Sequence, residues 1–240
     1  MLFDWDAQVA QRWREASAYT GYDRNLAALL LPLLNCCDTL CDVGCGLGLV
    51  DLELAPHFRE ITCVDISEDA LGELRTQIAA RGLKNIRTVC ADGMRLSGQW
   101  DAVMALFHGE PEEIVPDYLQ KAADRFLLVV HGSPYGTTGP KEYRIRKCCD
   151  TESTAAWLDA NGYRYTLSTG ELEFGQPHRS FEDAVAYTRT FSKGAPEEEI
   201  VRHVRETVTE TGRTDFPLYT PKKRSFGLFV LRRDENEQLP

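Results

Sequence analysis

One glycine-rich stretch decides the fold, Asp42-Val43-Gly44-Cys45-Gly46-Leu47-Gly48. It follows an apolar run over 39–43 that is typical of a buried strand, and it precedes a helical pattern over 49–58. Glycine lets the backbone turn sharply and places no Cβ between the chain and a ligand, while the N–H groups of the following helix point back at the turn. A strand, a glycine-rich turn and a helix in this order predict a ligand-binding loop.

Strand and helix patterns alternate outward from this turn. The further predicted strands span 61–65, 86–90, 100–107 and 125–131, and the helices between them span 68–81 and 114–123. This alternation is typical of a parallel sheet with helices on both faces. The sequence therefore predicts an α/β protein.

Two acidic residues stand where predicted strands end. Asp65 ends the second strand, and Ala91-Asp92-Gly93 follows the third. Because the carboxyl ends of parallel strands meet at one edge of a sheet, both acids are expected close to the glycine-rich turn. A carboxylate at 65 can accept both ribose hydroxyls of a nucleoside, and one at 92 can accept an adenine amino group while Gly93 lets the chain turn beneath the ring. The alternatives are a helix cap at 65 and a plain Asp-Gly turn at 92.

The spacing of the glycines distinguishes between two nucleotide-binding families. A dinucleotide turn needs G-x-G-x-x-G, and Leu49 occupies the last position. The observed G-x-G-x-G after Asp42 resembles motif I of the class I S-adenosylmethionine-dependent methyltransferases, and the resemblance covers about 23–132. It implies S-adenosylmethionine as the cofactor. The residues that it assigns to the cofactor site are Asp42, Gly44, Cys45, Gly46, Gly48, Asp65, Ile66, Asp92, Gly93 and Leu106.

The resemblance also implies how the sheet is completed. After a helix over 151–161, the strands expected over 163–174 and 225–232 match the hairpin that closes a seven-stranded, mostly parallel sheet in this family. The last strand is expected antiparallel, at or near an edge. An insertion over about 180–222 carries two helical patterns, near 181–191 and 196–211. The apolar face of the second helix is predicted to pack on the sheet, with a substrate lid as the alternative.

Residues 1–36 are predicted to form an N-terminal helical cap on a methyltransferase domain of residues 37–240. Trp5, Val9 and Trp13 recur every four residues, which indicates one face of a helix with Asp4 as its N-cap. A second helix is predicted over 23–34.

Candidate catalytic residues follow the fourth and fifth strands. His108 is the predicted general base, since histidine most often fills that role, and Glu110 is expected to orient a cationic acceptor. Tyr135 and His131 are further candidates. The alternative for His108 is a residue that only caps a strand end. The Asn/Asp-Pro-Pro-Tyr/Phe motif of N6-adenine and glutamine methyltransferases is missing here, which argues against methylation of DNA bases or protein amides.

The net charge restricts the acceptor class. The 240 residues carry a formal net charge of −10, which disfavours binding to a phosphate backbone. A small-molecule methyl acceptor is therefore expected. Alternatives are an RNA methyltransferase, a nucleoside-binding protein without catalysis and, least favoured, an NAD-dependent oxidoreductase. The basic stretches 141–147 and 222–224 are expected to be solvated faces, or else a patch for an anionic acceptor.

The eight cysteines lack the paired Cys-x-x-Cys spacing of a zinc site, so free thiols and no metal are expected. Residues 1–17 show no apolar leader, and the apolar run 26–34 is too short to span a membrane. These features predict a cytoplasmic protein without a membrane segment.

Overall fold

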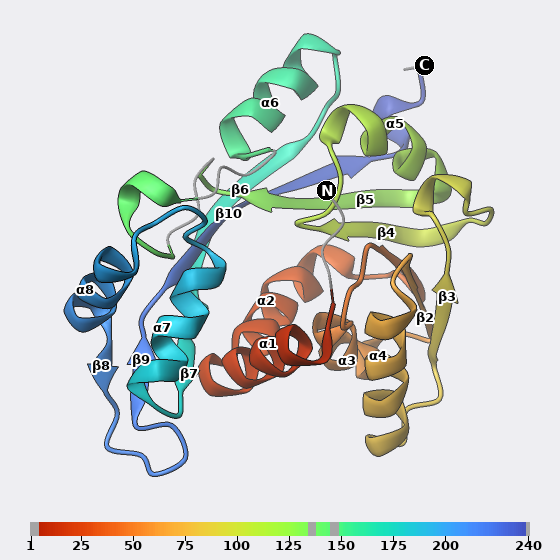
Figure 1. Ribbon diagram of the computed structural model, residues 1–240. Coiled ribbons are helices and arrows are strands. Elements are labelled where there is room, and N and C mark those ends of the chain that lie inside the picture. The colour runs from red at the N-terminus through yellow and green to blue at the C-terminus, as the bar shows by residue number, and fades with distance from the viewer. Residues whose placement is uncertain (1–4, 134–137, 145–148, 239–240) are drawn as a thin grey trace.

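A seven-stranded sheet forms the centre of the molecule (Figure 1). The computed structural model describes residues 5–133, 138–144 and 149–238. The strand order is β3-β2-β1-β4-β5-β10-β6. Its strands are β1 (Thr39–Val43), β2 (Glu60–Asp65), β3 (Ile86–Cys90), β4 (Trp100–Leu106), β5 (Ala122–His131), β6 (Thr166–Glu173) and β10 (Lys223–Arg232).

The sheet has the predicted fold class. β1 to β5 run parallel, whereas β10 runs antiparallel to both of its neighbours, β5 and β6. β10 therefore lies one strand in from the edge, and β6 is the edge strand. β1 pairs with β2 on one side and with β4 on the other, so the strand order reverses at β1. Open α/β sheets bind ligands at the carboxyl ends of the strands beside such a reversal.

Helices cover both faces of the sheet (Figure 1). One face packs against α2 (Tyr22–Leu30), α3 (Leu49–Leu54) and α4 (Glu68–Ala80), and the other against α5 (Pro111–Lys121) and α6 (Thr151–Ala160). The strands between them are apolar along most of their length, as expected for strands buried on both faces.

Proline shortens two of the predicted helices. The helix expected over 23–34 gives way at Leu31 to a 3₁₀ turn that contains Pro32. The helix expected over 49–58 ends at Leu54, before a 3₁₀ turn that contains Pro56. Proline has no N–H for the helical hydrogen bond, so it weakens the α-helical ladder at both places.

The first helix, α1 (Ala7–Thr20), begins later than the sequence predicts. Its N-cap is Asp6, whose carboxylate accepts the Val9 N–H at 2.8 Å, so the prediction of Asp4 as the cap was wrong. Asp4 itself lies outside the described residues. Trp5 precedes the helix, and its ring meets that of Trp13 edge to face at 5.4 Å. The division into a cap of residues 1–36 and a domain of residues 37–240 stays a prediction. α2, which belongs to the predicted cap, packs into the same core as the sheet.

The insertion before β10 builds a small core of its own. Its helices are α7 (Phe181–Thr190) and α8 (Glu197–Thr207), beside a sheet of β7 (Gln176–His178), β9 (Leu218–Thr220) and β8 (Thr209–Glu210). Ile200 and Val204 of α8 pack against Ala184 and Val185 of α7. The predicted packing of α8 on the main sheet was therefore wrong.

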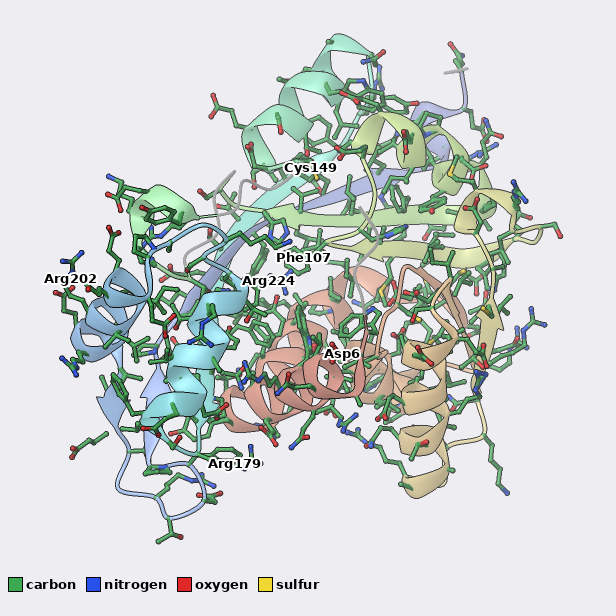
Figure 2. The ribbon with its side chains drawn as sticks, in the orientation of Figure 1. Asp6, Phe107, Cys149, Arg179, Arg202 and Arg224 are labelled. Atoms are coloured by element: carbon green, nitrogen blue, oxygen red, sulfur yellow. The ribbon has the colours of Figure 1, made fainter. Side chains whose placement is uncertain are left out.

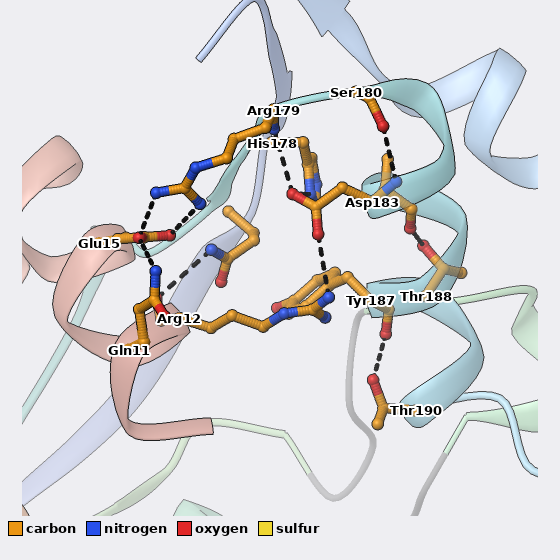
Figure 3. A network of polar contacts seen from close by, with 12 residues as sticks. Gln11, Arg12, Glu15, His178, Arg179, Ser180, Asp183, Tyr187, Thr188 and Thr190 are labelled. Carbon is orange, nitrogen blue, oxygen red and sulfur yellow. Dashed lines mark hydrogen bonds and ion pairs between the residues drawn. The ribbon is translucent and has the colours of Figure 1, made fainter. Parts of the chain in front are cut away.

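A polar network holds the insertion to α1 (Figure 3). Arg12 donates to Asp183 at 3.0 Å, and Arg179 donates to both oxygens of Glu15 at 2.6 and 3.0 Å. His178 lies buried beside this network, and burial lowers its pKa to about 4. The network connects α1 to the insertion through charged side chains, of which Arg12, Glu15 and Asp183 are partly buried.

Replacement of Asp183 by Asn is expected to loosen this contact. The variant loses the charge opposite Arg12, which corresponds to about 1.5–3 kcal/mol for a hydrogen bond between charged groups. Urea unfolding measures the loss, and faster limited proteolysis within 180–222 locates it. Asp215→Asn is the control, since Asp215 pairs with Arg213 on the exposed surface. Equal stability of the two variants would contradict a tethering role for Asp183.

Candidate active site

The glycine-rich turn joins β1 to α3 at the carboxyl edge of the sheet. Gly44, Gly46 and Gly48 have φ angles of 75°, 54° and 60°, all in the left-handed region that favours glycine. A Cβ on Gly44 would lie 2.2 Å from the ring of His108, and one on Gly46 would lie 2.7 Å from that of Trp5. The turn therefore needs glycine both for its backbone conformation and for the two rings that approach it.

Asp65 faces this turn from the end of β2. One carboxylate oxygen accepts the Gly46 N–H at 2.8 Å, and the other accepts the Ser67 N–H at 2.9 Å. Ser67 caps α4, so Asp65 is not that helix's cap. A carboxylate oxygen accepts more than one hydrogen bond, which leaves Asp65 able to accept two ribose hydroxyls as well.

Asp92 and Gly93 form a tight turn after β3. Asp92 is exposed and accepts the Met94 N–H at 3.0 Å, so the expected Asp-Gly turn is present. A Cβ on Gly93 would lie 2.2 Å from Val43. Ile66 and Met94 are 48% and 43% exposed, unusual for large apolar side chains, and they follow neighbouring strand ends. Such side chains suit the faces of an adenine ring.

Two buried carboxyls lie beneath the turn. Asp42 of β1 is 1% exposed, and Asp51 of α3 is fully buried. One oxygen of Asp42 and both oxygens of Asp51 have no hydrogen-bond partner among the described residues. Burial raises the pKa of both carboxyls, and the charge of Asp51 raises the pKa of Asp42 further, so the two carboxyls do not readily carry two charges. A ligand's ammonium group would satisfy such oxygens.

Asp51 was not predicted as a site residue. An acid in the first turn of a helix is expected from the helix dipole alone, so its sequence position gave no indication of a site. Cys45, by contrast, was predicted. It is half-buried, and its backbone N–H is already bonded to the Val64 carbonyl at 3.1 Å.

A left-handed residue ends β4. The strand stops at half-buried Leu106, one residue earlier than predicted, because Phe107 adopts a φ of 57°. This conformation is unusual for a bulky side chain, and such strain gathers at functional sites. The turn brings His108 against Gly44, with its Nε2 atom 3.5 Å from the Tyr118 hydroxyl.

The surroundings of His108 favour its neutral form. Burial lowers its pKa from the ordinary value of 6.5, while the charges of Asp65 and Asp92 oppose the shift without reversing it. A neutral imidazole can accept a proton. The structure thus places an unprotonated ring beside the cofactor turn at neutral pH.

The other predicted catalytic residues are more widely distributed. Glu110 flanks the start of α5, where its side chain makes no capping hydrogen bond. Tyr135 lies outside the described residues. His131 ends β5, and its ring centroid lies 5.0 Å from that of Phe107.

The basic stretch 222–224 is not the uniform solvated face that was expected. Lys223 is exposed and pairs with Glu171. Arg224 is half-buried instead, and its guanidinium lies over the ring of Phe107. Sequence alone did not show this contact, because Phe107 follows β4 and Arg224 lies on β10, and the topology of the sheet rather than the chain order brings them together.

No helix within the described part of the chain is long and apolar enough to cross a membrane. The described cysteines are all free thiols, and residues 5–133, 138–144 and 149–238 contain no cluster of three potential metal ligands.

Replacement of Asp51 by Asn is expected to stabilise the protein as the pH rises. The folded-state pKa is raised, so the folded protein retains a proton that the unfolded chain releases above about pH 4. The wild type therefore loses stability as the pH rises above that value, and the neutral amide does not. Differential scanning calorimetry should give a Tm gain of roughly 3–6 °C at pH 8 and little at pH 4.

Asp69→Asn is the matched control for this prediction, since Asp69 is an exposed acid in the first turn of α4. A Tm difference between Asp51→Asn and the wild type that does not grow with pH would contradict the assignment of a protonated carboxyl.

Comparison with known proteins identifies the domain. A family model described as a methyltransferase domain matches residues 40–127. The fold is similar to that of the YcgJ protein of Bacillus subtilis, at 16% identity and a TM-score of 0.55, over 87% of this chain and 98% of that one. It is also similar to magnesium protoporphyrin IX methyltransferase of Synechocystis with bound S-adenosylmethionine, at 17% identity and a TM-score of 0.52, over 93% and 91% of the chains.

A putative RNA methyltransferase of Pyrococcus horikoshii shares the fold at 12% identity and a TM-score of 0.54, over 88% of this chain and 84% of that one. At these identities the similarity shows the fold, while the family model matches the part of the chain that contains the turn over 42–48. Residues 40–127 thus match a methyltransferase domain, within a chain whose fold is similar to those of known methyltransferases.

Proposed function

We propose that this enzyme methylates a small molecule that binds at the carboxyl ends of β4 and β5, beside the start of the antiparallel strand β10. The observation that carries the proposal is the placement of His108. It follows β4 directly, lies against Gly44 of the cofactor turn and has a lowered pKa. This placement supports a role for His108 as the group that accepts a proton where cofactor and acceptor would meet.

Each part of the cofactor has a matching group. Asp65 suits the ribose, and Asp92 with Ile66 suits the edge and face of the adenine. The unsatisfied carboxyls of Asp42 and Asp51 suit the ammonium of the methionine part. The glycines at 44, 46 and 48 let the His108, Trp5 and Leu74 side chains approach the turn between these polar groups.

When bound, S-adenosylmethionine supplies an electrophilic methyl group on a sulfonium. The residues of this chain position the acceptor and remove its proton. His108 would take that proton from a hydroxyl, thiol or ammonium. Trp5 over Gly46 and Phe107 beside His108 would keep water away from the reacting atoms.

The charge of the protein favours a small acceptor over RNA. The fold serves both classes, since the Synechocystis protein is named for a porphyrin and the Pyrococcus protein is a putative RNA methyltransferase. A net charge of −10 opposes the many phosphate contacts on which RNA affinity depends.

A metabolite-library assay for S-adenosylhomocysteine release tests the proposal. At least one small molecule should stimulate release above the rate without acceptor. Release stimulated by tRNA alone, together with steeply salt-dependent tRNA binding, would contradict it.

Asp65→Asn is expected to weaken cofactor binding by about 1.5–3 kcal/mol, because the amide cannot accept both ribose hydroxyls. Titration calorimetry with S-adenosylhomocysteine measures this loss. Asp69→Asn, which removes an exposed acid four residues away, should bind as the wild type does. Unchanged affinity in a folded Asp65→Asn protein would mean that Asp65 only supports the turn.

His108→Gln is expected to lower kcat on the order of a hundredfold, because the general base is lost while the side-chain volume is largely kept. In the wild type, the rate should fall as the pH drops through a pKa below 6.5, where the imidazole becomes protonated. The variant should lack this acid limb, measured as kcat against pH.

His57→Gln is the control, since His57 is exposed. If His108→Gln keeps both its rate and the acid limb, His108 caps the strand end. His131→Gln should then show the loss instead.

A further inference from the structure

Arg224 lies among aromatic rings at the carboxyl edge of the sheet. Its guanidinium carbon is 3.5 Å from the ring centroid of Phe107, and Figure 2 shows the two side chains together near the centre of the molecule. Three further rings lie at 5.7 Å from the same carbon, those of Trp13, Tyr22 and Phe174. These four rings come from α1, from α2, from the end of β4 and from the end of β6.

The charge of Arg224 is not matched by an ion pair. None of the ion pairs among the described residues includes it, although its side chain is only partly exposed. The charge of Arg224 interacts with the carboxyl of Asp23 at longer range. Asp23 is itself buried, however, and it lies beyond ion-pair distance. A charge withdrawn from water without a counter-ion is unfavourable, and an anionic ligand would offset that cost.

The Tyr22 hydroxyl interacts with the guanidinium, and the stacking leaves the other N–H donors of its edge available. A guanidinium that lies over a ring uses its flat face, whereas its N–H donors point outward in its own plane. That edge matches the two oxygens of a carboxylate in a bidentate arrangement. The rings around it would contact an apolar, planar body better than a strongly hydrated one.

Arg224 lies next to residues of the proposed active site. Phe107, on which it stacks, is strained into the left-handed region and directly precedes His108. His131, at the end of β5, contacts Phe107 from a second side. An acceptor held at Arg224 and lying along Phe107 would therefore extend toward His108 and the cofactor turn.

We infer that Arg224 determines acceptor specificity by binding a carboxylate on a small acceptor whose planar, apolar body lies against Phe107. This inference rests on the proposed function. A single arginine among aromatic rings matches one carboxylate, whereas an RNA backbone requires several cations along its phosphates.

Calorimetric titration of the protein saturated with S-adenosylhomocysteine tests this inference. The probes are 4-hydroxybenzoate, phenylacetate and indole-3-acetate, each paired with its own primary amide. The wild type should bind at least one acid roughly ten- to a hundredfold more tightly than the matching amide. Arg224→Gln should lose that preference, whereas Lys223→Gln, which alters the exposed neighbour, should keep it.

The variant Arg224→Lys distinguishes carboxylate binding by Arg224 from a purely structural role of this residue. Lysine keeps the charge over the ring but lacks the fork of donors, so the acid preference should fall about tenfold at an unchanged Tm. The inference is overturned if no acid is preferred, if Arg224→Gln keeps the preference, or if the substitution instead weakens binding of tRNA. All variants should bind S-adenosylhomocysteine as the wild type does. Absence of that binding in the wild type would reject the proposed function itself, separately from the role of Arg224.

Discussion

The close contact between the glycine-rich turn and two aromatic rings is the constraint on which the site depends. His108 rests on Gly44 and Trp5 rests on Gly46, at distances that leave no room for a Cβ. The three glycines also hold left-handed backbone conformations. One turn therefore fixes the end of β4, the start of α1 and the position of Asp65, whose carboxylate accepts the Gly46 N–H. A side chain at either position would displace the ring that lies against it.

Around this turn the protein holds polar groups that its own residues leave incompletely satisfied. The carboxyls of Asp42 and Asp51 lack donors, and the guanidinium of Arg224 lacks an ion-pair partner among the described residues. Phe107 adds a strained backbone between these two places. Each feature is unfavourable for folding alone, and all lie at one edge of the sheet. The ammonium group of the cofactor would offset the cost of the buried carboxyls, and a carboxylate on the acceptor would offset that of the buried guanidinium.

Much of this fold is predictable because parallel strands and their helices leave strong periodic patterns. The strand at 39–43, the turn at 42–48 and the acid at 65 are local features, and the sequence indicates each of them correctly. Contacts that depend on topology are not visible in this way. The pairing of Arg224 with Phe107 requires β10 to lie beside β5, and the packing of α8 on α7 requires the insertion to turn back on itself. Strands of two or three residues, such as those of the small sheet, leave no pattern at all.

A crystal structure with S-adenosylhomocysteine tests the central claim most directly. We expect the ligand to lie across the turn at 44–48. Its ribose should contact Asp65, its adenine should lie beside Ile66 and Asp92, and its ammonium should lie near Asp42 and Asp51. The sulfur should then face His108, with Arg224 on the acceptor side. A ligand bound elsewhere, or one whose sulfur points away from His108, would contradict it.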